Sequence, residues 1–192
     1  MEEIIKFTEK IPTNNENLKL ICKPANVDFI VYDDLVKYSS IEDVLDDKDA
    51  VFILLQIHNS DGSTEAIGHW VLLLRRDEKI EYFDPLGHSH DDKFVIHITH
   101  EDPKILTKLL QGHNVIVNRY KFQKFEKQIN VCGLHCACRV FFRGIPLDEY
   151  YKLMTSVYKK DPDLIVAWIS LLARTDIDGD DILKHFNLKK LI

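Results

Sequence analysis

The stretch HWVLLLRRDEKIEYF, residues 69–83, decides the fold because it predicts a β-hairpin. Residues 69–74 are almost continuously apolar, and residues 79–83 alternate polar and apolar side chains with the two-residue period of a strand. The charged residues 75–78 between them suit a turn. We therefore expect two antiparallel strands here, side by side in a sheet.

The regions on either side of this hairpin add strands and helices. Residues 51–57 form a near-continuous apolar run, which is typical of a buried strand. Further strands are expected at residues 29–32 and 115–122, and helices at 33–45 (broken near Ser39-Ser40), 103–110, 132–142, 147–158, 164–172 and 180–186, with 12–28 mostly loop. The apolar stripe in 164–172, which includes Trp168, is expected to be core. A central mixed sheet flanked by helices belongs to the α+β class.

Length and composition indicate one globular domain. The chain has 192 residues, of which 45% are hydrophobic and 29% charged, an ordinary balance for a protein with a sizeable core. No repeat, low-complexity tract or linker divides it, so we expect a single domain over 1–192, with 1–50 as an N-terminal extension packed on the core. The net charge of −6 argues against a nucleic-acid groove, and we predict no nucleic-acid partner.

The termini and cysteines bear on the compartment. The acidic start Met1-Glu2-Glu3 lacks the apolar segment of a secretory signal, and no apolar run is long enough to span a bilayer. Four cysteines without such a signal favour free thiols in a reducing compartment. We therefore expect a protein that is neither secreted nor membrane-bound. We also expect it to be monomeric.

A second informative stretch is Val131-Cys132-Gly133-Leu134-His135-Cys136-Ala137, which opens the expected helix 132–142. A thiol has an ordinary pKa of about 8.5. A helix N-terminus and a nearby imidazolium both stabilise the thiolate and lower that pKa. Cys132 is therefore a candidate nucleophile, with free space at Gly133 for a substrate backbone. The alternative is a buried structural thiol.

The hairpin supplies an imidazole and a carboxylate to go with this thiol. His69 starts the first strand and Asp84 follows the end of the second, so both side chains should emerge at the same end of the sheet. A carboxylate there can accept from one imidazole nitrogen and leave the other to face the thiol. Trp70 is equally suited to shield the imidazole or to fill the core, and Asp84-Pro85-Leu86-Gly87 also suits a plain turn.

Three segments together resemble a known family: Gly68-His69-Trp70-Val71, Tyr82-Phe83-Asp84-Pro85-Leu86-Gly87 and Cys132-Gly133-Leu134-His135-Cys136. They look like the adenain-like and ubiquitin-like-protease superfamily of cysteine proteases, closest to the proteases of DNA viruses and virus-like transposons. The likeness covers about residues 51–143. It implies a papain-like catalytic core in permuted order (His, Asp, Cys), with the nucleophile at a helix N-terminus.

The resemblance also implies a glutamine that stabilises the oxyanion. Family members place it six or seven residues before the nucleophile, where this chain has Glu126 and Phe125. The candidates are Gln123, which ends a strand-like stretch, and Gln128. We favour Gln123 because a loop two residues longer would restore the family layout.

The predicted function is therefore that of a cysteine endopeptidase that uses His69, Asp84, Cys132 and Gln123. By resemblance, its substrate is a viral polyprotein or structural precursor. The resemblance also implies that the protein acts inside the host cell, in cytoplasm, nucleus or virion. The alternatives are an isopeptidase that removes ubiquitin or a ubiquitin-like modifier, and a non-enzyme: an inactive binding module or a zinc-stabilised adaptor. Adenain-like enzymes use a peptide and DNA as cofactors, but the acidic balance here predicts no DNA activation. We predict no cofactor and no metal.

Three clusters contain residue types that can bind metal ions, but we favour a metal site less than the protease hypothesis for each of them. Cys132, His135, Cys136 and Cys138 carry zinc-ligand chemistry, but they lack two separated ligand pairs. The histidines 88, 90, 97 and 100, with Asp91 and Asp92, are expected to form a solvated loop. The aspartates 176, 178, 180 and 181 resemble part of a calcium loop, yet Gly179 is misplaced for an EF-hand and no glutamate follows at the required position.

Overall fold

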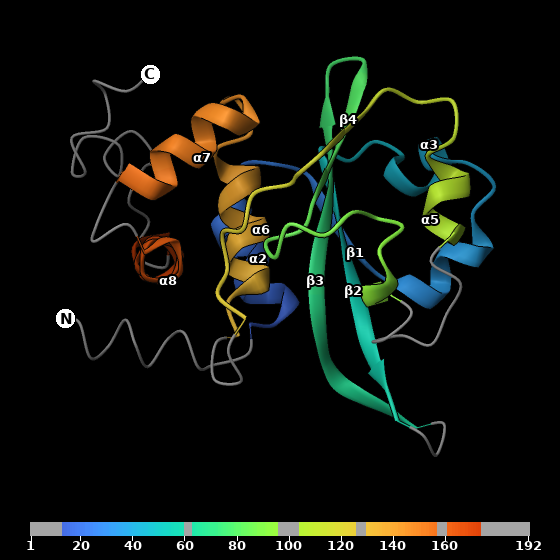
Figure 1. Cartoon of the computed structure of the whole chain (residues 1–192), viewed down its shortest axis with the longest axis horizontal. Helices are drawn as coiled ribbons and strands as arrows, with labels where there is room; N and C mark the ends of the chain where they lie inside the picture. Colours follow the sequence, from blue (N-terminus) through green and yellow to red (C-terminus); the bar gives the residue numbers. More distant parts are fainter. Residues whose placement is uncertain (1–12, 60–62, 96–103, 126–129, 157–160, 174–192) are drawn as a thin grey trace.

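A five-stranded mixed sheet forms the centre of the protein (Figure 1). The computed structural model describes residues 13–59, 63–95, 104–125, 130–156 and 161–173. The strands follow chain order across the sheet: β1 (Val27–Val31), β2 (Ala50–His58), β3 (Thr64–Arg76), β4 (Lys79–Phe83) and β5 (Val115–Val117). The pairs β2–β3 and β3–β4 are antiparallel, whereas β1–β2 and β4–β5 are parallel. The predicted hairpin is confirmed.

Helices cover both faces of this sheet (Figure 1). One face carries α2 (Asn15–Cys22), α6 (Cys132–Phe141), α7 (Leu147–Ser156) and α8 (Pro162–Ala173). The opposite face carries the 3-10 helix η1 (Tyr32–Lys37), α3 (Ile41–Leu45) and α5 (Lys104–Leu109). The α+β class is therefore confirmed. Within the described residues, no helix is long and apolar enough to cross a membrane.

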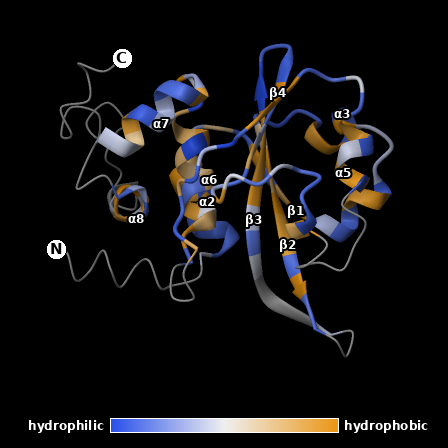
Figure 2. Ribbon diagram, viewed as in Figure 1, coloured by the Kyte–Doolittle hydropathy of each residue, from blue (hydrophilic) through white to orange (hydrophobic). Residues whose placement is uncertain are grey.

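The two helical layers explain why the central strands are apolar without alternation. Along β2, Phe52 packs into the core with α6, while Val51 and Ile53 on either side of it pack into the core with α3 and α5. A strand buried on both faces needs apolar side chains at every position. Figure 2 shows the result, with hydrophobic residues concentrated in the strands and in the helices beside them.

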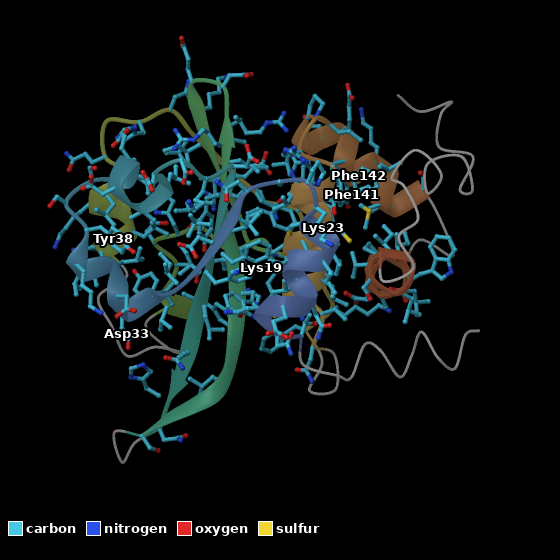
Figure 3. The ribbon with its side chains drawn as sticks, turned by 180° about the vertical axis from the view of Figure 1, so that it is seen from behind. Lys19, Lys23, Asp33, Tyr38, Phe141 and Phe142 are labelled. Carbon is cyan, nitrogen blue, oxygen red and sulfur yellow. The ribbon has the colours of Figure 1, made fainter. Side chains whose placement is uncertain are left out.

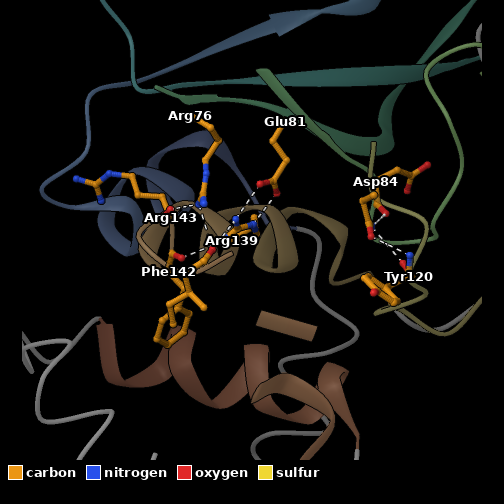
Figure 4. A network of polar contacts seen from close by, with 9 residues as sticks. Arg76, Glu81, Asp84, Tyr120, Arg139, Phe142 and Arg143 are labelled. Atoms are coloured by element: carbon orange, nitrogen blue, oxygen red, sulfur yellow. Dashed lines mark hydrogen bonds and ion pairs between the residues drawn. The ribbon is translucent and has the colours of Figure 1, made fainter. Parts of the chain in front are cut away.

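Helix α6 is fixed to the sheet by a buried ion pair. Arg139 donates to both carboxylate oxygens of Glu81 on β4, at 2.6 and 2.8 Å, and both residues are buried (Figure 4). The same guanidinium donates to the carbonyl of Phe142, just past the end of α6. From behind, Phe141 and Phe142 lie above α2 with its Lys19 (Figure 3). The position of Cys132 is therefore set relative to β4, which leads into Asp84.

Several expected elements differ from the structure. The region 12–28 contains helix α2, which begins because the Asn14 side chain accepts from the Asn17 N–H at 2.9 Å. Strand β5 ends at Val117 instead of residue 122, because the Asn118 side chain bonds the backbone of Tyr120 in both directions and starts a turn. The expected helix 180–186 lies outside the described residues.

Candidate active site

His69 and Asp84 form a buried pair at one end of the hairpin. Strand register pairs Leu72 with Phe83, so Asp84 emerges beside the start of the apolar part of β3. The Nε2 atom of His69 lies 2.7 Å from Oδ1 of Asp84, and the two side chains are 8% and 1% exposed. Because both side chains are buried, water screens the His69–Asp84 hydrogen bond little, and its electrostatic attraction is strong. The structure brings these two predicted residues together.

Asp84 is held in place by contacts beyond the imidazole. The backbone N–H of Leu86 donates to Oδ1 at 2.8 Å, and the Asn118 amide donates to the Asp84 carbonyl at 2.6 Å. Nδ1 of His88 lies 3.4 Å from Oδ2. The Asp-Pro-Leu-Gly segment is therefore both a turn, closed by the Gly87 N–H on the Asp84 carbonyl, and the support of the carboxylate.

Cys132 completes the cluster from the other side. It is the first residue of α6 and is only 8% exposed. The backbone N–H of Trp70 donates to its Sγ at 3.5 Å, and the thiol interacts with the His69 side chain. Nε2 of His69 is occupied by Asp84, which leaves Nδ1 as the ring nitrogen available to the thiol. The three predicted residues thus lie in series, as thiol, imidazole and carboxylate.

The electrostatics of this series favour a charged pair. Burial by itself lowers the pKa of His69, but the negative charge of Asp84, its hydrogen bond and the Cys132 contact outweigh burial and raise that pKa to about 10. Burial raises the pKa of Cys132, yet the His69 hydrogen bond and charge, with the N–H groups of Trp70 and Gly133, lower it overall. Burial would also raise the pKa of Asp84, but the His69 charge holds it well below its usual value.

The other three cysteines show the opposite behaviour. Burial raises the pKa of Cys22 to about 12 and raises those of Cys136 and Cys138 well above the usual value for a thiol. All four cysteines lie in the described part of the chain and are free and buried. Cys132 therefore differs from its neighbours through its contacts and not through its exposure.

Gln123 lies close to this cluster, in the loop after β5. Its backbone N–H donates to the carbonyl of Pro85, the residue next to Asp84, at 3.0 Å. The alternative candidate, Gln128, lies outside the described residues. Gln123 also lines an open pocket of about 680 Å³, together with His88 and Phe94. The Phe94 ring packs edge-on against His69 with centroids 5.5 Å apart, so this pocket adjoins the site.

The structure decides one open sequence interpretation, that of Trp70, and corrects another, that of Gly133. Trp70 packs edge-on against Phe29 and Phe52, so its ring belongs to the core. A Cβ atom on Gly133 would lie 3.1 Å from the Trp70 side chain and 3.2 Å from Leu18. The space beside Gly133 is therefore filled by core side chains, and the glycine permits close packing of α6 where we expected room for a substrate.

The residues of the expected clusters have other partners. His135 is bound to Asp163 and His90 to Thr107, while His88 approaches Asp84. Among the residues that the structure describes, no three histidine, cysteine or acidic side chains are grouped as metal ligands. His97, His100 and the aspartates 176–181 lie outside the described residues.

Sequence reasoning missed His88 and Asn118 as supports of Asp84. His88 was expected in a solvated loop, although its position four residues after Asp84, across a Pro-Leu-Gly turn, is compatible with a return toward the carboxylate. Asn118 was expected within a strand, and the low strand propensity of asparagine was a usable signal that the strand ends there.

The fold and this cluster define an α+β protein with a thiol, an imidazole and a carboxylate in contact at the start of a buried helix. No family model matches the chain. It is similar to the Uncharacterized protein V9 of Sputnik virophage, with 30% identity over 180 residues, which cover 87% of this chain and 98% of the virophage protein. The chain therefore belongs to the family of that viral protein.

Proposed function

We propose that this protein is a cysteine protease with His69, Asp84 and Cys132 as its catalytic triad. The observation that carries the proposal is the unbroken series from Cys132 through His69 to Asp84, buried and closed by a contact of 2.7 Å. An inert structural thiol has no use for a charged imidazole that lowers its pKa. The resemblance to adenain-like proteases implies a permuted papain-like core, and the virophage relative supports only the viral part of the proposal.

In the proposed reaction, the Cys132 thiolate attacks the carbonyl carbon of a peptide bond. The tetrahedral oxyanion is stabilised by the backbone N–H of Cys132 and the amide of Gln123. His69, protonated at the nitrogen facing the thiol, gives that proton to the leaving amine, and a thioester remains. A water molecule then loses a proton to His69 and attacks the thioester, which releases the acid and restores the thiolate. Asp84 stabilises the imidazolium and fixes its orientation throughout.

The substrate is proposed to be a protein, namely a viral polyprotein or structural precursor cleaved beside small residues. The binding-module alternative is less favoured because a module that only binds has no need of three catalytic groups in contact. The zinc-adaptor alternative is less favoured because His135 is bound to Asp163 and Cys132 to His69.

Covalent trapping tests this function. Purified protein is treated with two vinyl sulfones, one on a short peptide ending in glycine and one on ubiquitin, and adducts are read by intact mass. We expect an adduct that is lost in Cys132→Ala and strongly reduced in His69→Ala. The control Cys136→Ala, which removes a thiol one turn further along α6, should keep the adduct.

The pattern of labelling separates the alternatives. Faster labelling by the ubiquitin probe than by the peptide probe would favour removal of a ubiquitin-like modifier over peptide cleavage as the function. Labelling that persists without Cys132, or that is unaffected by loss of His69, would refute the triad and leave the binding module as the better explanation.

A further inference from the structure

A second buried imidazole–carboxylate pair lies behind the candidate active site. Nε2 of His135 is 2.8 Å from Oδ1 of Asp163, and both side chains are 0% exposed. His135 is in α6, three residues after Cys132, and Asp163 is in the first turn of α8. Neither residue touches His69 or Asp84 in the contacts described above, so the proposed triad does not account for them.

This pair is attached to the loop that carries Gln123. The second oxygen of Asp163 accepts the backbone N–H of Lys124 at 3.1 Å. On the other side, the N–H of Gln123 itself donates to the Pro85 carbonyl at 3.0 Å. Gln123 is therefore held through two consecutive peptide groups, one tied to the turn of Asp84 and one tied, through Asp163 and His135, to the helix of Cys132.

Packing reinforces this attachment. The ring of Phe122, which precedes Gln123, lies 6.3 Å from the ring of His135 and is 2% exposed. The N–H of Phe122 also donates to the Pro85 carbonyl, at 2.8 Å. The loop segment 122–124 is thus fixed at each of its three residues.

Stability alone is a poor explanation of the pair. A buried ionic or polar pair contributes little more than apolar packing of the same volume, because both groups lose their hydration. The partial positive charge at the N-terminus of α8 stabilises the Asp163 carboxylate and offsets part of its lost hydration. An apolar residue at this position would lose no hydration and would need no such stabilisation. What apolar packing cannot do is hold a specific backbone N–H at a fixed place.

We propose that Asp163 and His135 are positioning residues that place Gln123 for its role at the oxyanion. Asp163 joins three elements: α8, the Gln123 loop and, through His135, the first turn of α6. Loss of this connection leaves the thiolate intact and misplaces the donor that stabilises the tetrahedral intermediate. The inference rests on the proposed function, since it assigns Asp163 to the same reaction.

Two small electrophiles distinguish a loss of thiolate reactivity from a loss of oxyanion stabilisation. Iodoacetamide alkylates a thiolate by displacement and forms no oxyanion, whereas p-nitrophenyl acetate acylates it through a tetrahedral oxyanion. The ratio of the acylation rate to the alkylation rate at Cys132, read by peptide mass, therefore measures oxyanion stabilisation. Neither reagent requires the natural substrate sequence.

We expect Asp163→Ala to lower this ratio by about 100-fold, the usual effect of losing one oxyanion donor, with the alkylation rate changed by less than about threefold. Gln123→Ala should lower the ratio equally. The double variant should be no worse than either single one, because both changes remove the same contribution. Asp163→Asn keeps an oxygen for the Lys124 N–H and should restore most of the ratio.

The chain offers a matched control in Lys124→Ala. Its ammonium is bonded to Asp161, and this change removes that exposed contact but keeps the backbone N–H on Asp163. The ratio should therefore stay at the wild-type value. If Asp163→Ala does not fold, His135→Asn, which withdraws the partner of Asp163, provides the same test.

Three outcomes would overturn the positioning role. These are an unchanged ratio in Asp163→Ala, an equal fall of both rates, or an effect that adds to that of Gln123→Ala. If instead wild-type Cys132 is alkylated no faster than the same thiol in urea-unfolded protein, the proposed function itself fails. The two failures are therefore distinguishable.

Discussion

At His69, burial and charge act on the same imidazole in opposite directions. Burial disfavours the imidazolium, and the raised pKa depends on Asp84 and Cys132. The charge of residue 84 therefore matters as much as its place in the fold, since a neutral side chain of the same shape would leave only the Cys132 contact to oppose burial.

Replacing Asp84 by asparagine should lower the pKa of His69. Asp84→Asn keeps the size and the hydrogen bond to the Leu86 N–H but removes the negative charge. We expect the pKa of His69 to fall well below about 10, because the largest contribution that opposes burial is lost and only the Cys132 contact remains. NMR titration of the His69 ring measures this value. A pKa that stays near 10 would show that the carboxylate charge does not set it.

The grouping of His69, Asp84 and Cys132 was the part of the candidate site that sequence predicted best. His69, Asp84 and Cys132 carry chemistry that few residue types share, and each has a distinctive local sequence. Asn118 and Asp163 could not be found in this way, because their contacts join segments that are distant in the chain. His88 lies only four residues after Asp84, but its local sequence carries no distinctive motif. Asp163, for instance, lies 28 residues from its partner His135 in the chain.

Among the elements, β3 depends on a close approach at Gly68. A Cβ atom there would lie 2.1 Å from the carbonyl oxygen of Leu55 on β2. Gly68→Ala should therefore force the two strands apart just before His69 and lower the free energy of unfolding by about 1–3 kcal/mol. Urea denaturation measures this loss. In the matched control Gly144→Ala, a Cβ meets no atom within 4 Å, so stability should change little. Equal stability of both variants would contradict the account of β3.

The contact between α6 and β4 depends on Arg139 and Glu81. Arg139→Met leaves the Glu81 carboxylate buried without its partner, so we expect a loss of about 3–5 kcal/mol in urea denaturation. The double variant Arg139→Met with Glu81→Leu removes both charges and should recover much of that loss. A double variant as unstable as the single one would show that packing, and not the buried charge, is responsible.

Elements could be predicted where periodicity or continuous apolarity was strong, as in β2, the hairpin and α6. Prediction failed where a side chain intervened locally. Asn118 ends β5 five residues early, and Asn14 starts α2 in a region expected to be loop. The two-sided burial of the sheet was implied by the apolar run of β2, but the helices that cover each face were not assigned.

At the scale of the whole molecule, the negative charge bears on activation. With a formal net charge of −6, the surface offers no general attraction for a polyanion. We expect duplex DNA at about 50 mM salt to leave the trapping rate of Cys132 unchanged. Fluorescence anisotropy with labelled DNA serves as the binding measurement. Salt-sensitive binding together with faster trapping would contradict this expectation.

The architecture places the three proposed catalytic groups where separate parts of the fold meet. β3 brings His69, the turn after β4 brings Asp84 and the first turn of α6 brings Cys132. The Arg139 ion pair fixes α6 to β4, and Asp163 fixes the Gln123 loop to α6. Such preorganisation by the scaffold is what nucleophilic catalysis requires.

The most direct test of the central claim is the pH dependence of Cys132 alkylation by iodoacetamide. The thiolate–imidazolium pair forms above the lowered pKa of Cys132 and persists until His69 loses its proton near pH 10. We predict that the wild-type rate reaches its plateau at a pH below the usual thiol pKa of about 8.5. In His69→Ala, where burial is no longer opposed by the imidazolium, the midpoint should rise above that value. Identical profiles for the two proteins would contradict the claim that His69 activates Cys132.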